Sequence, residues 1–148
     1  MIQTLRACML LCLLTMMPLW AQAMTQPNPT LTPGVLCTAS DPNFSGYAYA
    51  EHIAKCNRNV DDQEKNDIAH AYGNIPQADW VKYEFDHLIP LCVGGSDDIK
   101  NVWPQVLSEA HEKDKLENEI CIGMQTGKMT QAEAIQKVRD WFQSRTAQ

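Results

Sequence analysis

Residues 83–105, with the sequence YEFDHLIPLCVGGSDDIKNVWPQ, constrain the fold more than any other stretch of this chain. Its first six residues are rich in aromatic side chains, and Pro90 follows soon after, which predicts a short strand that enters a loop. Two consecutive glycines indicate that this loop contains backbone with positive φ. Asp86 and His87 therefore stand side by side where the predicted strand ends.

Helices are predicted on both sides of this stretch. Residues 59–72 have Asn59 as a possible cap, acidic residues in the first turn and a glycine directly after them, all of which favour a helix. Ser108 can cap a second helix that runs to about Ile122.

The last helix has the clearest start signal. Thr130 to Glu133 fits a capping box, and Ile135, Val138 and Phe142 follow on one apolar face. The predicted order is helix, short strand, long glycine-containing loop, helix and helix. The fold class is therefore expected to be α+β and mostly helical.

The first residues of the chain have the pattern of a secretory signal. Arg6 precedes an uncharged, mostly apolar run from Ala7 to Trp20, and Ala21-Gln22-Ala23 has the form of a signal-peptidase site. We interpret residues 1–23 as a secretory signal that is cleaved near Ala23, with an uncleaved anchor as the alternative. The run is shorter than the ~20 residues of a spanning helix, so we expect a secreted or periplasmic protein that is not embedded in a membrane.

The rest of the chain predicts one acidic domain. Residues 24–34 contain three prolines and predict an extended linker, and residues 35–148 predict a single domain, expected to be monomeric. The formal charge of −6 becomes −7 when Arg6, the one charged residue of the signal, is removed. A protein that binds nucleic acid through its overall field is basic. Contact with phosphates would therefore need a local cationic patch and a bound metal.

Four cysteines remain in the mature chain, an even number that favours two disulfides in a secreted protein. We expect Cys37 to pair with Cys56 and Cys92 with Cys121, because each bond would tie a loop to a neighbouring element. The spacing leaves the two other pairings open. A zinc site is a weaker alternative, because the chain has no C-x-x-C pair.

A second group of polar residues lies in LSEAHEKDKLENEIC, residues 107–121. On a helix, His111, Asp114, Lys115 and Asn118 line one side. If this helix packs on the strand, Asp86, His87 and His111 converge on one point, where a divalent cation and a phosphate could bind. The segment HEKDK lacks the second histidine of the zinc-protease signature, so that function is excluded.

These residues, within the frames DHLIPLCVGGSDDIKNVWPQ and AHEKDKLEN, resemble the HNH motif of small secreted bacterial endonucleases. The similarity covers roughly residues 83–121, with a looser likeness at Cys56-Asn57-Arg58. It implies a ββα-metal finger: a short two-stranded hairpin packed on a helix, flanked by additional helices and braced by disulfides. It also implies metal-dependent hydrolysis of DNA, and by extension RNA, with little sequence specificity, leaving 5′-phosphate and 3′-hydroxyl ends.

The resemblance assigns a role to each matching residue. His87 would be the general base, which a side chain with a pKa near ~6.5 can be at neutral pH. Asn101 would brace the loop and orient the His87 ring. Asp86 and His111 would be metal ligands, with Asp114 as a possible third.

One position departs from family members that have an all-histidine metal site, because Lys115 stands where they carry a further histidine. The remaining ligands suit Mg²⁺ best, with Mn²⁺, Ni²⁺ or Zn²⁺ as substitutes. Lys115, Lys113 and Arg58 are the expected phosphate contacts. The chain implies no inhibitor protein, although one could exist. The competing hypothesis is a non-catalytic, disulfide-stabilised binding domain that keeps the HNH scaffold, and the acidic charge is its main support.

Overall fold

The computed structural model describes residues 26–146, so the predicted secretory signal lies outside the described residues. It is an α+β structure with two small antiparallel hairpins, which agrees with the predicted fold class. In chain order the elements are β1 (Phe44–Ala48), β2 (Ile53–Cys56), α1 (Asp62–Ala71), the 3₁₀ helix η2 (Gln77–Lys82), β3 (Tyr83–His87), the 3₁₀ helix η3 (Leu91–Val93), β4 (Val102–Val106), α2 (Leu107–Gln125) and α3 (Gln131–Thr146).

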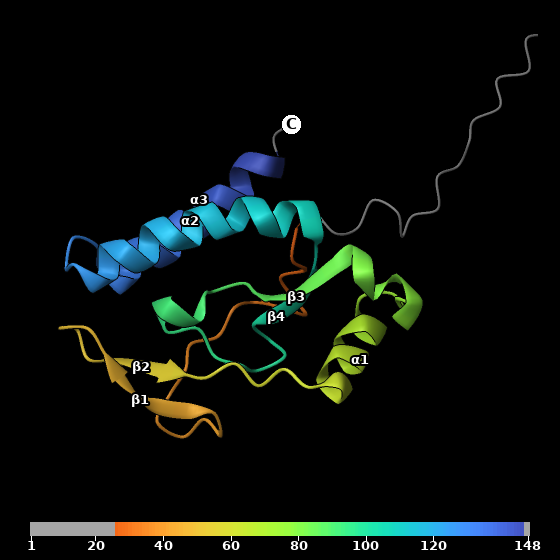
Figure 1. Ribbon diagram of the computed structural model, residues 1–148, viewed down its shortest axis with the longest axis horizontal. Helices are drawn as coiled ribbons and strands as arrows, with labels where there is room; N and C mark the ends of the chain where they lie inside the picture. Colours follow the sequence, from red (N-terminus) through yellow and green to blue (C-terminus); the bar gives the residue numbers. More distant parts are fainter. Residues whose placement is uncertain (1–25, 147–148) are drawn as a thin grey trace, which may run out of the picture.

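The β3–β4 hairpin lies at the centre of the molecule, between α2 and α3 on one side and α1 on the other (Figure 1). The two strands pair antiparallel, with Tyr83 opposite Val106 and His87 opposite Val102. Strand β4 runs directly into α2, so strand, loop, strand and helix are consecutive. The residues by themselves predicted only the first of the two strands.

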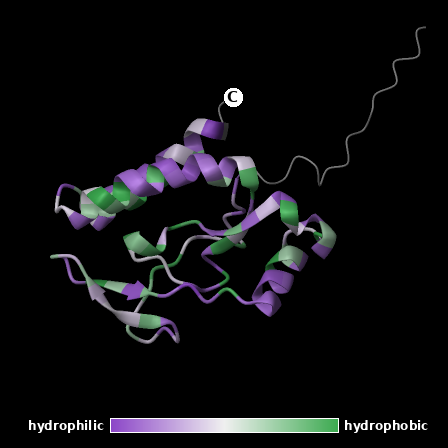
Figure 2. Cartoon of the chain, viewed as in Figure 1, coloured by the Kyte–Doolittle hydropathy of each residue, from purple (hydrophilic) through white to green (hydrophobic). Residues whose placement is uncertain are grey.

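Both faces of this hairpin are covered by apolar side chains. Trp103 packs into a core with residues of α2 and α3, including Ile120 and Phe142. Its neighbour Val102 packs on the other side, with Phe85 of β3 and residues of α1. Figure 2 shows hydrophilic residues along much of α1 and α2. Because β4 is buried on both faces, it has no polar and apolar alternation that would reveal a strand.

The helix starts differ in part from the predicted ones. Helix α1 is capped by Asp61, which forms a capping box with Glu64, and not by Asn59. Thr130 and Glu133 bond reciprocally at the start of α3, as predicted. Ser108 does not cap α2, because this helix continues straight from β4 and has no side-chain cap.

Residues 26–34 do not form the extended linker that their prolines predicted. Thr32 is 1% exposed, and its hydroxyl lies 2.6 Å from the hydroxyl of Tyr72. Gln26 donates to the carbonyl of Phe142 in α3, and Gly34 donates to the carbonyl of Lys100. The segment is therefore part of the domain, held by polar contacts that composition does not reveal.

The β1–β2 hairpin was not predicted. It lies at one end of the molecule, away from α1 (Figure 1), and its strands pair from Phe44–Cys56 to Ala48–Ile53. In the connecting turn, Tyr49 has φ 61° and His52 has φ 57°. Residues other than glycine seldom adopt this left-handed backbone region. A turn made of such residues carries no glycine or proline signal, so the sequence conceals it.

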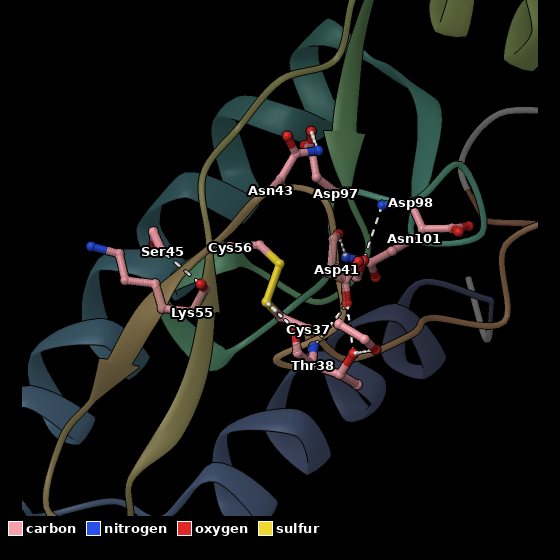
Figure 3. Close-up of a disulfide and its surroundings, with 12 residues drawn as sticks. Cys37, Thr38, Asp41, Asn43, Ser45, Lys55, Cys56, Asp97, Asp98 and Asn101 are labelled. Carbon is pink, nitrogen blue, oxygen red and sulfur yellow. Dashed lines mark hydrogen bonds between the residues drawn. A yellow bond between two sulfur atoms is a disulfide. The ribbon is translucent and has the colours of Figure 1, made fainter.

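The two disulfides join Cys37 to Cys56 and Cys92 to Cys121, which confirms the predicted pairing. Figure 3 shows the first, which ties the segment before β1 to the end of β2. The second ties η3 to α2, on the side of the hairpin that carries Asp86. Two disulfides fit an extracellular or oxidising compartment. None of the described helices has the length and apolar character needed to cross a membrane.

Removing either disulfide should lower the free energy of unfolding by about 2–4 kcal/mol, because each bond closes a long loop in the unfolded chain. We expect this for Cys92→Ala with Cys121→Ala, and for Cys37→Ala with Cys56→Ala. Urea titration followed by circular dichroism measures the change, and reduction of the wild-type protein is the control. An unchanged midpoint in either double variant would show that the bond does not support the fold.

Candidate functional site

A small hollow of about 220 Å³ opens where the end of β3, the segment around η3 and α2 meet. Its walls carry an unusual concentration of charged side chains. The residues that line it are Arg58, Glu84, Asp86, His87, Pro90, Leu91, Cys92, Asp114, Glu117 and Cys121. The structure therefore brings together four of the predicted site residues: His87, Asp86, Asp114 and Arg58.

His87 is the most constrained of these residues. Its side chain is 4% exposed, and both ring nitrogens have partners: Nε2 lies 2.8 Å from Oδ1 of Asp97, and Nδ1 lies 3.2 Å from Nη1 of Arg58. Because a guanidinium only donates, Nδ1 must accept. The proton of the neutral ring is then on Nε2 and is donated to Asp97. The ring is thus held as a neutral imidazole whose basic nitrogen lies on the Arg58 side.

The electrostatics agree with this tautomer. Burial lowers the pKa of His87 below its ordinary value, the hydrogen bond to Asp97 opposes this effect, and the Arg58 guanidinium adds to it. The net direction is downward, so the ring is neutral at pH 7. A buried histidine in this state can accept a proton without first losing one.

Asp97 was not among the predicted site residues. Oδ1 faces His87, while Oδ2 accepts from the backbone N–H of Asn59 at 2.6 Å and from the Asn43 side chain at 3.2 Å. Figure 3 shows Asp97 and Asn43 directed toward each other. One buried carboxylate thus connects the end of β3 with two segments of the N-terminal half. The only sequence signal for it is a pair of aspartates in a long, largely apolar loop.

Asn101 braces the loop as predicted, but it does not orient the His87 ring by a hydrogen bond. Its side-chain amide donates to the carbonyls of Ile89 and Ser96, and its Oδ1 accepts from the Ile89 N–H at 3.0 Å. The side chain is fully buried. The ring of His87 is oriented by Asp97 and Arg58 instead, so that part of the prediction is wrong.

The two glycines of this loop serve different purposes. Gly94 has φ 88°, in the left-handed region that glycine adopts without strain. Gly95 does not have such a φ, but a Cβ atom there would lie 1.9 Å from the carbonyl oxygen of Ile89 and 2.8 Å from Nδ2 of Asn101. Gly95 is therefore required by the close approach of the two ends of the loop.

Lys113 occupies a position that the sequence did not predict. Its ammonium is fully buried and contacts Oδ2 of Asp86 and the carbonyl of His87, each at 2.7 Å, as well as the carboxylate of Glu117. The neighbouring carboxylates raise its pKa although burial opposes them, so Lys113 is charged. The prediction that Lys113 contacts phosphate is wrong, because an ammonium with three acceptors has no donor left.

His111 and Lys115 lie away from the hollow. Lys113 and Glu117 are on the face of α2 that packs on the hairpin, and His111 precedes Lys113 by two residues, a rotation of about 200° around a helix. His111 is therefore exposed on the opposite side, and the prediction that it meets Asp86 and His87 is wrong. Lys115 is also exposed and pairs with Glu112 at 2.8 Å. Helix α2 lines the hollow through Asp114 and Glu117, and not through His111.

The hollow carries more negative than positive charge. Four carboxylates, those of Glu84, Asp86, Asp114 and Glu117, face only two cations, Arg58 and Lys113. Burial raises the pKa of Glu84, and the carboxylates of Asp86 and Asp114 raise it further. Burial likewise raises the pKa of Glu117. If all four carboxylates are ionised, two negative charges remain unbalanced, which matches one divalent cation.

The donor set suits a cation that keeps part of its water. Within residues 26–146, three possible ligand atoms lie within 4.8 Å of one another only at Cys37, Asp41 and Cys56, and there the two sulfurs form the disulfide. The carboxylates of the hollow are more widely spaced, so a cation there would bind one or two of them directly. Mg²⁺ binds in this way, through one or two carboxylates with water and phosphate completing its octahedron. The residues therefore fit the expected metal, with acidic ligands of α2 in place of His111.

Replacing Gly95 with alanine should distort the backbone of the loop that carries Asp97. We expect Gly95→Ala to lower the free energy of unfolding by at least about 2 kcal/mol more than Gly73→Ala, because the new Cβ must displace the backbone. Gly73 is a suitable control because it has φ 99° and no heavy atom within 4 Å of an added Cβ. Urea unfolding of both variants provides the comparison. Equal losses would mean that the loop tolerates the added atom.

Replacing Glu84 with glutamine should stabilise the metal-free protein at pH 7. The folded state raises the pKa of Glu84 above its ordinary value of 4.5, so the ionised carboxylate opposes folding at neutral pH. The opposition fades as pH falls through the raised pKa of the folded state and is absent below 4.5, and the benefit of Glu84→Gln should fade with it. Added Mg²⁺ should raise the Tm of the wild type more than that of the variant.

The exposed Glu112 provides the matched control for this measurement. Its hydrogen bond with Lys115 lowers its pKa, so Glu112→Gln should have the opposite sign at pH 7 and no effect on the response to Mg²⁺. Thermal unfolding at pH 7 and pH 4, with Mg²⁺ and with EDTA, tests both variants. A wild-type Tm that does not respond to Mg²⁺ would argue against a cation in the hollow.

Comparison with known proteins adds no assignment to this geometry: no family model, no curated protein and no solved structure matches the chain.

Proposed function

We propose that this protein is a secreted, metal-dependent endonuclease of the HNH type, which hydrolyses phosphodiester bonds of nucleic acid. The observation that carries the proposal is the state of His87. It is a neutral imidazole, oriented by a buried carboxylate, beside a hollow that four carboxylates line. A positioned base next to a set of carboxylates that could hold a divalent cation suits metal-dependent hydrolysis of a phosphodiester.

Arg58 connects substrate binding to the base. Its guanidinium covers Nδ1 of His87 and donates to the carbonyl of Phe85 at 2.6 Å. Within the part of the chain that the structure describes, Arg58 forms no ion pair with a carboxylate. A phosphate offers a stronger, bidentate partner than a neutral ring nitrogen. An incoming phosphate is therefore expected to draw Arg58 away and to uncover Nδ1.

The proposed reaction is an in-line hydrolysis. A water oxygen attacks phosphorus while its proton passes to Nδ1 of His87, and the bond from phosphorus to the 3′ oxygen breaks. Asp97 stabilises the imidazolium that forms, since its carboxylate accepts the hydrogen bond from Nε2–H. The 3′ oxygen leaves as a hydroxyl after taking a proton from solvent, and the phosphate stays on the 5′ end.

The metal belongs to the carboxylate side of the hollow. Asp86 would hold it, together with Glu84, Asp114 or Glu117, while Lys113 keeps Asp86 in place. When bound, a divalent cation would offset the charge of the phosphate and of the leaving oxygen. Asn101 acts indirectly, by fixing the loop that carries Asp97.

The competing hypothesis is a binding domain without catalysis. Arg58 covers the base in the structure and the chain is acidic, and a binding domain would keep both features permanently. The two hypotheses differ in one respect: only a nuclease needs Arg58 to move away from Nδ1 of His87, so that this nitrogen can accept a proton.

Conversion of supercoiled plasmid by the oxidised protein, with Mg²⁺, Mn²⁺ or EDTA, tests the proposal. We expect metal-dependent nicking or linearisation that His87→Ala reduces by roughly 100-fold or more, because general base catalysis contributes about that much. His111→Ala is the matched control, since this histidine is exposed on the far side of α2. It should cleave like the wild type. Intact plasmid in every metal, from folded protein, would favour the binding domain.

A further inference from the structure

A second hollow, of about 400 Å³, adjoins the first and has no assigned role. It lies between the β1–β2 hairpin and η3, and it shares Arg58, Leu91 and Cys92 with the site described above. Its volume is within the roughly 300–1,000 Å³ of small-molecule sites. The two hollows therefore form one continuous surface with Arg58 at the junction.

The walls and the rim of this second hollow differ in character. Apolar walls come from Ala48, Ile53 and Leu91, and more of the lining is apolar than polar. Lys55 is an exposed cation at the hollow. Among residues 26–146, Lys55 forms no ion pair with a carboxylate, and the same is true of Arg58. Such a lining suits a flat, mostly apolar group that is attached to an anion.

Tyr49 adds an aromatic wall in an unusual backbone conformation. Its φ of 61° costs energy for a residue other than glycine, and such strain tends to persist at functional positions. The half-buried side chain packs against the main core, and burial raises the pKa of its hydroxyl. Tyr49 thus lines the hollow from a turn with a strained backbone.

We infer that the second hollow binds a nucleobase of the strand whose phosphate Arg58 holds, and that the preferred substrate is single-stranded nucleic acid. This inference rests on the proposed function. A phosphate at Arg58 leaves the attached nucleoside beside the hollow, where an aromatic and apolar wall can stack a base of any sequence. A base inside a duplex is already stacked and paired, so it could enter only by flipping out.

The charge of the protein points in the same direction. Duplex DNA has a higher density of phosphates than a single strand, and its binding depends more steeply on neutralising cations. An acidic chain whose hollow offers two cations without a carboxylate partner, Lys55 and Arg58, is better matched to one strand than to two. Stacking in the hollow would supply affinity that the overall charge cannot.

Binding without cleavage tests the inference. The oxidised protein is titrated in EDTA against a fluorescent 12-nucleotide dT strand, an abasic strand of the same length and charge, and a 12-base-pair duplex. We expect fluorescence anisotropy to show the dT strand binding roughly 5- to 100-fold more tightly than the abasic strand, because a stacked base contributes that much. The duplex should bind more weakly than the dT strand. A 12-nucleotide rU strand tests RNA in the same way.

A pair of tyrosine variants locates the base. Tyr49→Asn should lose most of the preference for dT over the abasic strand, and asparagine is chosen because it tolerates positive φ. Tyr47→Asn is the matched control, on the same hairpin, because Tyr47 is 51% exposed, stacks on His52 and does not line the hollow. It should keep the preference. Circular dichroism confirms that both variants fold.

The comparison of strands needs only the wild-type protein, so it tests the inference even if a variant unfolds. Equal binding of the abasic strand and of both base-carrying strands would overturn the inference, as would tighter binding of the duplex. Neither result depends on cleavage. Failure of this inference is therefore distinguishable from failure of the nuclease proposal, which the plasmid assay with His87→Ala tests separately.

Discussion

The hydrogen bond between His87 and Asp97 is the contact on which the site depends. It joins the end of β3 to the long loop, and the second oxygen of Asp97 joins both to Asn43 and Asn59. Because both side chains are almost fully buried, neither could be left without its partner at low cost. The same contact sets the tautomer of the ring. A bond that stabilises the fold thus also prepares the histidine to accept a proton.

The helix α2 balances the charges of the site. Lys113 lies in the interior between Asp86 and Glu117, where an unpaired carboxylate would be costly. It offsets part of the negative charge and leaves the rest unbalanced at the surface of the hollow. Under the proposed function, a cation would bind at these carboxylates, and Arg58 on the same hollow would meet the phosphate. This arrangement explains how an acidic chain could act on a polyanion.

The sequence predicted the fold class, the strand at β3 and the later helices, because these depend on local signals. The even number of cysteines predicted two disulfides, and the pairing followed from the expectation that each bond ties a loop to a neighbouring element. The sequence missed β4, whose two faces are both buried, and the β1–β2 hairpin, whose turn contains Tyr49 and His52 in place of glycine. Of the residues that it proposed for the site, His87, Asp86, Asp114 and Arg58 line the hollow, whereas His111 does not and Glu117 was not proposed. Which side of a helix faces inward is decided by packing, and His111 and Lys113 differ by only two positions in sequence. Asp97 could not be found, since its role arises only when the loop folds back on β3.

The protonation state of His87 tests the account most directly. Nitrogen-15 NMR of the imidazole distinguishes the two neutral tautomers from the charged ring in the folded, metal-free protein. We expect a neutral ring protonated at Nε2 at pH 7, which stays neutral as the pH falls through the ordinary histidine value of 6.5, because burial and Arg58 lower its pKa. A ring protonated at Nδ1, or one charged at pH 7, would contradict this expectation, since neither form offers Nδ1 to a water molecule.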